Sequence, residues 1–231
     1  MMVERAVDGF LLLNTPAESL NVPVPVVAIS AHSAAENVTN IVLNHHKAVE
    51  QALIHLYELG HRRIAFMRGP RAIPDSEYRW QGIQKVAVEM GLRIDTNLVI
   101  RIDDAGWSMK KGYHPMAPEI GFNSMKALLE KSRDFTAIFC FNDIAAIGAI
   151  RALKDAGLSV PGDVSVVGFD DILSAAYATP SLTTVRQPLT EMGKRGAQVL
   201  LERIGQRDGS MPAKIVMDPE LIVRESTGKA R

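Results

Sequence analysis

The stretch Thr136-Ala-Ile-Phe-Cys-Phe141 opens the part of the sequence that decides the fold. It is almost entirely apolar, which is typical of a strand that is buried on both faces of a parallel sheet. A helical pattern of apolar residues follows and ends at Gly157, and a second apolar run, Val164-Ser-Val-Val-Gly-Phe169, comes next. Because two neighbouring parallel strands need such a crossover, this region predicts a β-α-β unit.

The same alternation continues in both directions along the chain. Further strands are expected at 6–13, 24–30, 40–43, 63–67, 97–102 and 182–187, with one or two more within 215–224. Helices are expected before Gly60, around Trp80, around Met125 and over 189–204, and a long loop is expected at 107–120. The strands outnumber those of a typical single sheet, so we predict an α/β protein with two doubly wound parallel-sheet subdomains.

Composition excludes several classes of function. The 231 residues include 26 Lys and Arg and 26 Asp and Glu, so this chain has no electrostatic reason to bind DNA by itself. The single cysteine, Cys140, cannot form an intramolecular disulfide. The sequence has no signal-peptide pattern and no apolar run near the roughly 18 residues that a membrane span needs. We therefore expect a cytoplasmic protein with no membrane partner.

The sequence also lacks the usual signs of catalysis. His45 and His46 are adjacent, so in an extended segment they point to opposite faces and cannot share a metal ion. We find no zinc-type spacing, no glycine-rich phosphate loop and no nucleophile paired with a base. Cys140 is interpreted as a small buried apolar residue. We expect no metal, no cofactor and no enzymatic activity.

Seven landmarks, in order, resemble the lactose-repressor/galactose-repressor family of bacterial transcription regulators. They are Val7-Asp-Gly9, Leu59-Gly-His-Arg-Arg-Ile-Ala65, Arg79 three residues before Gly82, Ala137-Ile-Phe-Cys-Phe-Asn-Asp143, Val160-Pro-Gly-Asp-Val-Ser-Val-Val-Gly-Phe-Asp-Asp171, Pro180-Ser-Leu-Thr-Thr-Val185 and Leu221-Ile-Val-Arg-Glu-Ser-Thr227. Each landmark alone is weak evidence. Together they cover nearly the whole chain, which makes the resemblance specific.

The resemblance implies two periplasmic-binding-protein-like subdomains joined by three crossovers. It assigns 1–60 plus 186–208 to an N-terminal subdomain and 61–185 plus 209–231 to a C-terminal subdomain. It also implies that a small polar metabolite, such as a sugar, binds in the cleft between them. In this interpretation the chain is the effector-sensing domain of a homodimeric regulator, and DNA is bound only through a separate helix-turn-helix head.

Compared with the family, the sequence lacks that head, the hinge helix and the first β-α-β segment of the N-terminal subdomain. We therefore expect a truncated chain with an incomplete N-terminal subdomain. The first strand is central in a 2-1-3-4-5 sheet, so its absence leaves residues 7–13 as an apolar edge strand, which is an aggregation hazard.

The resemblance assigns two main ligand contacts. Arg79 supplies a planar guanidinium, which can bond two adjacent hydroxyl groups or a carboxylate. Asp170 ends a predicted strand, where parallel sheets bind their ligands, and it is the strongest acidic candidate. The structural alternatives are an exposed helix arginine and a turn residue.

Three further candidates have equally plausible structural roles. Asn142 and Asp143 stand at the start of a helix, where one can cap the helix while the other contacts the ligand, and Asn142 is the favoured contact. Trp107 offers a flat apolar face to a sugar or a base, although it can equally pack in a core.

Four weaker candidates come from matched positions only: Asn44, Asp75, Gln187 and Leu189. The family commonly has Asp at the position of Asn44, and some members have an aromatic residue at that of Leu189. These departures concern the identity of the effector. Two other functions remain as alternatives, a sugar-binding protein of a transport system and an α/β enzyme that acts on a sugar.

Overall fold

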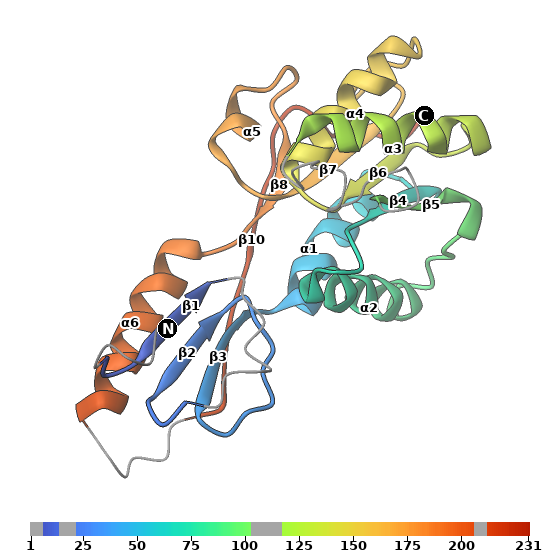
Figure 1. Ribbon diagram of the computed structural model, residues 1–231. Helices are drawn as coiled ribbons and strands as arrows, with labels where there is room; N and C mark the ends of the chain where they lie inside the picture. Colours follow the sequence, from blue (N-terminus) through green and yellow to red (C-terminus); the bar gives the residue numbers. More distant parts are fainter. Residues whose placement is uncertain (1–6, 14–21, 103–116, 206–211) are drawn as a thin grey trace. The chain divides into compact units, whose positions relative to one another are not determined.

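A computed structural model describes residues 7–13, 22–102, 117–205 and 212–231 (Figure 1). The chain divides into two compact units, which we call unit 1 (Met1–Asn44 and Pro188–Pro219) and unit 2 (His45–Gln187 and Glu220–Arg231). Each unit contains one sheet. The α/β prediction, with parallel sheets in two subdomains, is confirmed.

Unit 2 is built on a six-stranded sheet with the order β10-β8-β7-β6-β4-β5. Its strands are β4 (Ile64–Arg68), β5 (Val99–Arg101), β6 (Ala137–Cys140), β7 (Ser165–Asp170), β8 (Thr183–Arg186) and β10 (Glu220–Ile222). All neighbouring strands are parallel except β10, which runs antiparallel to β8. The carboxyl ends of β4 to β8 therefore meet at one edge of this sheet.

Helices cover both faces of the unit 2 sheet. They are α1 (His45–Glu58), α2 (Pro74–Glu89), α3 (Pro118–Lys131), α4 (Asp143–Asp155) and the short α5 (Leu173–Tyr177), with a 3₁₀ turn, η1 (Thr96–Leu98), before β5. Helices α3 and α4 lie on one face, and α1 and α2 lie on the other (Figure 1). This is the doubly wound arrangement that the β-α alternation predicts.

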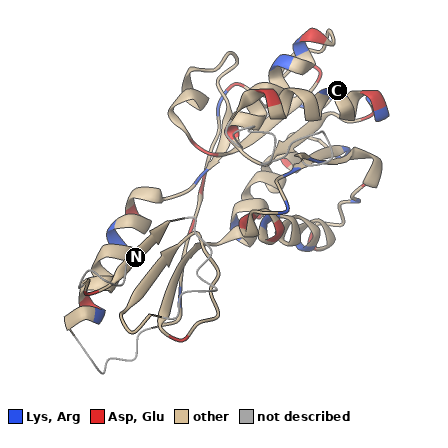
Figure 2. Cartoon of the chain, in the orientation of Figure 1, with Lys and Arg blue, Asp and Glu red and all other residues tan. Residues whose placement is uncertain are grey.

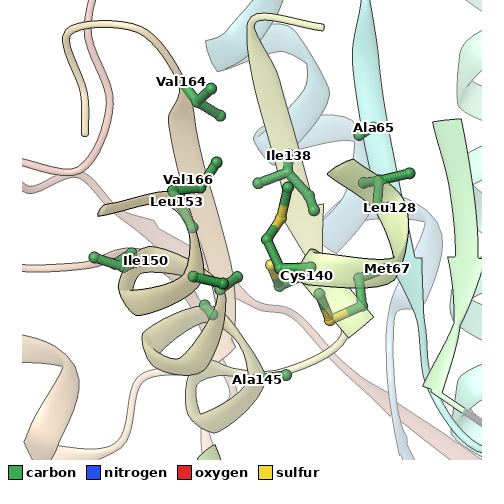
Figure 3. Packing of buried hydrophobic residues seen from close by; sticks show 14 of the residues in the cluster. Ala65, Met67, Leu128, Ile138, Cys140, Ala145, Ile150, Leu153, Val164 and Val166 are labelled. Atoms are coloured by element: carbon green, nitrogen blue, oxygen red, sulfur yellow. The ribbon is translucent and has the colours of Figure 1, made fainter. Parts of the chain in front are cut away.

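The main core lies between the unit 2 sheet and helices α3 and α4. Figure 3 shows Met67, Ile138 and Val166 from three neighbouring strands in the same cluster as Leu128 of α3 and Leu153 of α4. All five side chains are at most 2% exposed. Because side chains alternate along a strand, the intervening residues face the opposite helices.

The second face of the sheet is aromatic. The rings of Phe66 on β4 and Trp80 on α2 meet edge to face, with 6.1 Å between their centroids. Phe139 on β6 and Phe169 on β7 have centroids 6.4 Å apart. Each strand of this region is thus buried on both faces, which explains its continuous apolar sequence.

Two glycines allow α3 and α4 to pack closely. A Cβ at Gly121 would lie 1.9 Å from the carbonyl oxygen of Ala145, and one at Gly148 would lie 1.9 Å from that of Pro118. Since real Cβ atoms do not approach other atoms so closely, a larger residue at either position would push the helices apart.

Unit 1 contains a four-stranded parallel sheet with the order β1-β2-β3-β9. The strands are β1 (Phe10–Leu13), β2 (Val26–Ile29), β3 (Val38–Leu43) and β9 (Lys214–Met217), and helix α6 (Leu189–Gly205) packs against them. Strand β1 is an edge strand, and Leu13 is 62% exposed. No strand within the described ranges pairs with its outer side, in agreement with the predicted apolar edge.

Two segments belong to a different unit from the one expected. Helix α1, within the segment 1–60 assigned to the N-terminal subdomain, packs on α2 and β10 in unit 2. Strand β9, within the segment 209–231 assigned to the C-terminal subdomain, pairs with β3 in unit 1. Their apolar patterns predict a helix and a strand. The elements against which they pack are decided by tertiary contacts, which the local pattern does not encode.

Smaller differences concern element ends. Helix α3 begins at Pro118, so the last residues of the expected loop 107–120 are helical, and the short helix α5 was not predicted. Gly60 has φ +94°, consistent with its predicted role at the end of α1. None of the helices in the described ranges is both long enough and apolar enough to cross a membrane.

Candidate functional site

Charged residues on the strands of unit 2 gather at one edge of the sheet. The charged residues within its described strands are Arg68, Arg101, Asp170, Arg186 and Glu220. The first four are each the last residue of a parallel strand. Glu220 begins the antiparallel strand β10 and lies opposite Arg186 of β8. In Figure 2 most of each strand is accordingly tan. In open α/β sheets this carboxyl edge is where ligands bind.

Arg79 is held against this edge from helix α2. Its side chain is only 6% exposed, and its Nη1 donates a hydrogen bond to the carbonyl oxygen of Phe141, just after β6. The guanidinium carbon lies 3.3 Å from the centroid of the Phe169 ring. These contacts fix the plane of the guanidinium, as cation–π stacking on an aromatic ring does. The alternative of an exposed helix arginine is therefore excluded.

The charge of Arg79 is balanced by acids of the same unit. Burial lowers the pKa of the Arg79 guanidinium to about 10, and the carboxyl groups of Asp170, Asp75 and Asp143 oppose that shift. With this pKa the group remains protonated at neutral pH. The result is a buried cation that is oriented by aromatic and carbonyl contacts and flanked by acids.

Asp170 ends β7 in a conformation that L residues rarely adopt. Its φ is +111°, and that of the following Asp171 is +58°. Such backbone strain costs on the order of 1–3 kcal/mol for each residue and is concentrated at functional sites. Gln187 donates its Nε2–H to Asp170 Oδ1 at 2.6 Å. Burial raises the pKa of the Asp170 carboxyl, although Arg79 and Gln187 act in the opposite direction.

Asp171 serves the structure beside this site. Its Oδ1 accepts a hydrogen bond from Arg224 Nη2 at 2.6 Å, and its Oδ2 accepts one from Arg186 Nε at 2.7 Å. Although burial acts in the opposite direction, these bonds lower the pKa of Asp171. Arg186 also pairs with Glu220 at 3.0 Å, so this network ties β8, β10 and the end of β7 together.

Asn142 and Asp143 both have structural partners. Asn142 is the N-cap of α4, and its Oδ1 accepts a hydrogen bond from the backbone N–H of Ala145 at 2.8 Å. Asp143 is fully buried, and its two oxygens accept hydrogen bonds from the Thr184 hydroxyl and the Ile172 backbone N–H. Burial raises the pKa of Asp143 to about 7, although both bonds oppose this shift.

Asp75 lies in the first turn of α2, four residues before Arg79. Its Oδ1 is 3.4 Å from His45 Nε2. Unit 2 thus brings together the candidates Asp75, Arg79, Asn142, Asp143, Asp170 and Gln187.

The remaining candidates lie elsewhere. Asn44 follows β3 in unit 1, where its Nδ2 donates to Asp218 Oδ1 at 3.1 Å and its backbone N–H donates to Met217. Leu189 begins α6, also in unit 1, and is 54% exposed. Trp107 lies outside the described residues.

Sequence reasoning missed an arginine cluster at the carboxyl ends of β4 and β5. Glu77 of α2 pairs with Arg68 at 3.0 Å and with Arg101 at 2.6 Å. The Arg68 guanidinium also lies over the Trp80 ring at 4.3 Å. A signal was present in the sequence, because in both cases a charged residue ends an apolar run.

Several buried polar atoms at this edge make no hydrogen bond within the described part of the chain. They are Arg68 Nε, Ser76 Oγ, Arg79 Nε and Gln187 Oε1. Buried polar groups are normally satisfied by protein, solvent or a ligand. Fold and site together define a ligand-binding domain of the periplasmic-binding-protein type.

Comparisons with known proteins agree with this class of domain. Residues 53–227 match the family described as "Periplasmic binding protein-like domain". The chain is 32% identical over 235 residues to the HTH-type transcriptional repressor CytR of Escherichia coli K12, an alignment that covers 98% of this chain. It spans 64% of the length of that repressor.

Solved structures give the same result. A complex of the transcriptional regulator CelR with cellobiose is 31% identical with a TM-score of 0.79, and the match covers 95% of this chain and 66% of that one. A periplasmic binding protein/LacI transcriptional regulator from Alkaliphilus metalliredigens QYMF, in complex with D-xylulofuranose, is 30% identical with a TM-score of 0.75. That match covers 96% of this chain and 78% of the other. The chain belongs to the periplasmic binding protein-like family, within its lactose-repressor branch of transcription regulators.

Proposed function

We propose that the chain is the effector-sensing domain of a bacterial transcription regulator and that it binds a small polar metabolite at the carboxyl edge of the unit 2 sheet. The observation that carries this proposal is that the same edge holds a buried cation, Arg79, and a strained acid, Asp170, whose carboxyl group opposes the lowering of the Arg79 pKa. Electrostatic balance between these two residues does not by itself require a positive φ at the acid.

A sugar is the ligand class that suits these groups best. The planar guanidinium of Arg79 can donate to two adjacent hydroxyl groups, and the carboxylate of Asp170 can accept from a third. Asn142 and Asp75 remain candidate contacts in unit 2, and Asn44 and Trp107 remain candidates elsewhere in the chain. The relatives solved with cellobiose and with D-xylulofuranose support the same class of ligand.

In the intact regulator, ligand binding would change operator affinity through a helix-turn-helix head. A ligand shifts such an equilibrium only by the difference in its affinity for the two conformations. We propose a homodimer that acts in the cytoplasm, as expected for a DNA-binding repressor. The curated relatives are named as transcriptional repressors, which does not favour the alternative of a transport protein.

A thermal-shift screen tests this proposal. The probes are mono- and disaccharides that include cellobiose and D-xylulose, with inorganic phosphate as an anionic comparison. A ligand at about 100 times its Kd should stabilise the protein by about 2.7 kcal/mol. Arg79→Ala and Asp170→Ala should abolish that shift, because each removes charge-assisted hydrogen bonds.

Arg62→Ala is the matched control. Arg62 also stacks on an aromatic ring, with its guanidinium carbon 3.4 Å from the Tyr57 centroid, but it lies outside the carboxyl edge. This variant should keep the full ligand-induced shift. Unfolding of each variant without ligand shows whether it folds. An undiminished shift in both Arg79→Ala and Asp170→Ala would remove these residues from the site.

A further inference from the structure

A small cavity lies beside Arg79, which contributes to its lining. It has a volume of about 10 Å³, and Arg68, Gly69, Ser76, Arg79 and Trp80 contribute to its lining. Three of the polar atoms without a hydrogen bond within the described ranges, Arg68 Nε, Ser76 Oγ and Arg79 Nε, belong to these residues. Each of these three atoms is buried, so bulk solvent does not satisfy them.

The size and the polarity of this cavity match a single water molecule. A cavity needs roughly 10–15 Å³ to hold one water, which typically makes about three hydrogen bonds. The two arginine Nε–H groups can donate to the two lone pairs of the water, and the Ser76 hydroxyl oxygen can accept one of its protons. A dry cavity would instead leave three polar groups unsatisfied, at about 1–3 kcal/mol each.

Gly69 keeps the space open. A Cβ at this position would lie 2.6 Å from Ser76 Oγ and 2.2 Å from the ring of Phe141. A side chain here would therefore enter the cavity and collide with its walls. Glycine at the end of β4 is thus explained by close approach.

We propose that Ser76 is a positioning residue that fixes the Arg79 guanidinium through one buried water. Nη1 of Arg79 bonds the Phe141 carbonyl, the face of the guanidinium stacks on Phe169, and Nε bonds the water. Three constraints on one planar group leave a single orientation for ligand contact. The consequence for the ligand rests on the proposed function, whereas the water itself does not.

Nuclear magnetic resonance of the full 231-residue chain, labelled with ¹⁵N at arginine, tests this proposal without any ligand. The Nε–H signal of Arg79 should show a cross-peak to a water that stays bound for longer than a nanosecond. Ser76→Ala should lose this cross-peak, because the water then lies between two cations with no acceptor for its protons. Ser124→Ala is the matched control, since Ser124 is also a buried hydroxyl without a hydrogen-bond partner in the described ranges but lies on α3, away from the cavity.

Gly69→Ala provides a second route, because its methyl group would displace the water and should also remove the cross-peak. If Gly69→Ala does not fold, a high-resolution crystal structure of the unmodified chain decides the matter by showing solvent within 3.2 Å of Arg79 Nε and Ser76 Oγ, or none. An absent cross-peak, or one that survives in Ser76→Ala, would overturn the proposal. So would an anomalous bromide peak in the cavity after a bromide soak, which would identify a halide site instead.

Discussion

The parallel sheets of the two units differ in the residues at the carboxyl ends of their strands. In unit 2 the parallel strands β4, β5, β7 and β8 end in charged residues, and in unit 1 all four strands end in apolar ones. A parallel sheet binds ligands at that edge. Within the described residues, charged groups at the carboxyl ends of parallel strands are therefore concentrated in unit 2.

The hydrophobic core is also more extensive in unit 2 than in unit 1. Unit 2 buries both faces of a six-stranded sheet, and its largest cluster includes residues from α3, α4 and four strands. Unit 1 has smaller clusters, and its edge strand β1 alternates between half-buried and exposed residues. The comparison indicates that unit 2 can hold a precise site because its framework is packed from both sides.

The largest expected effect compares a core side chain of unit 2 with an exposed side chain on the edge strand of unit 1. Leu153→Ala in unit 2 removes a side chain that is 0% exposed and should cost about 2–5 kcal/mol of unfolding free energy. Leu13→Ala in unit 1 truncates a side chain that is 62% exposed and should cost no more than about 0.5 kcal/mol. Urea unfolding followed by circular dichroism measures both. Equal losses would contradict the proposed difference between the units.

A smaller effect concerns the amino ends of the unit 2 strands. His61 is 2% exposed, and its ring nitrogens contact Thr136 Oγ1 at 2.8 Å, Ser165 Oγ at 3.0 Å and the Gly228 carbonyl at 3.0 Å. Burial lowers the pKa of His61 below 6.5, and the Gly228 carbonyl opposes that shift. The neutral ring is therefore the form that the folded state prefers.

The sign of the pH dependence follows from this shift. Below pH 6.5 the unfolded chain binds a proton at His61 more readily than the folded chain does, so the stabilisation present above that pH is lost on acidification. His61→Gln keeps one donor and one acceptor but does not titrate. The stability of the unmodified chain relative to His61→Gln should fall from pH 7.5 to pH 5.5, by at most about 1.4 kcal/mol for each pH unit.

Asp143 contributes to the pH dependence with the opposite sign. Because Asp143 is present in both proteins, its contribution cancels when the stability of His61→Gln is subtracted from that of the unmodified chain. The raised pKa of Asp143, about 7, makes acidification favourable to the folded state between the unfolded and folded pKa values. Urea unfolding at several pH values provides the measurement. A difference that stays constant with pH would show that His61 does not titrate differently in the two states.

Much of this architecture can be predicted from sequence because its signals are local. The apolar run 136–141 predicts β6, and Asn142 and Asp143 before a helical pattern predict an N-cap at one of the two, which is Asn142. The unit to which α1 belongs could not be predicted, since its apolar face suits either sheet. Pairing of β9 with β3 spans some 170 residues and has no local signal.

The residues of the candidate site were selected in a different way from the elements of the fold. Arg79 and Asp170 were selected by resemblance, and their burial, stacking and backbone strain are properties of the folded chain. Arg68 and Arg101 were missed because a single arginine after an apolar run is also typical of a solvated strand end. Only their shared edge of the sheet shows that they belong together.

Chemical-shift mapping of the ¹⁵N-labelled chain, with the saccharide that gives the largest thermal shift, locates the ligand on the protein. Amide signals should change at the carboxyl ends of β4, β6 and β7 and at Arg79, and stay constant at the opposite ends of these strands. The competing location is the cavity of about 430 Å³ between α3 and α4, lined by Phe122, Lys126 and Asp155 among others. Changes confined to that cavity, with none near Asp170, would contradict the account.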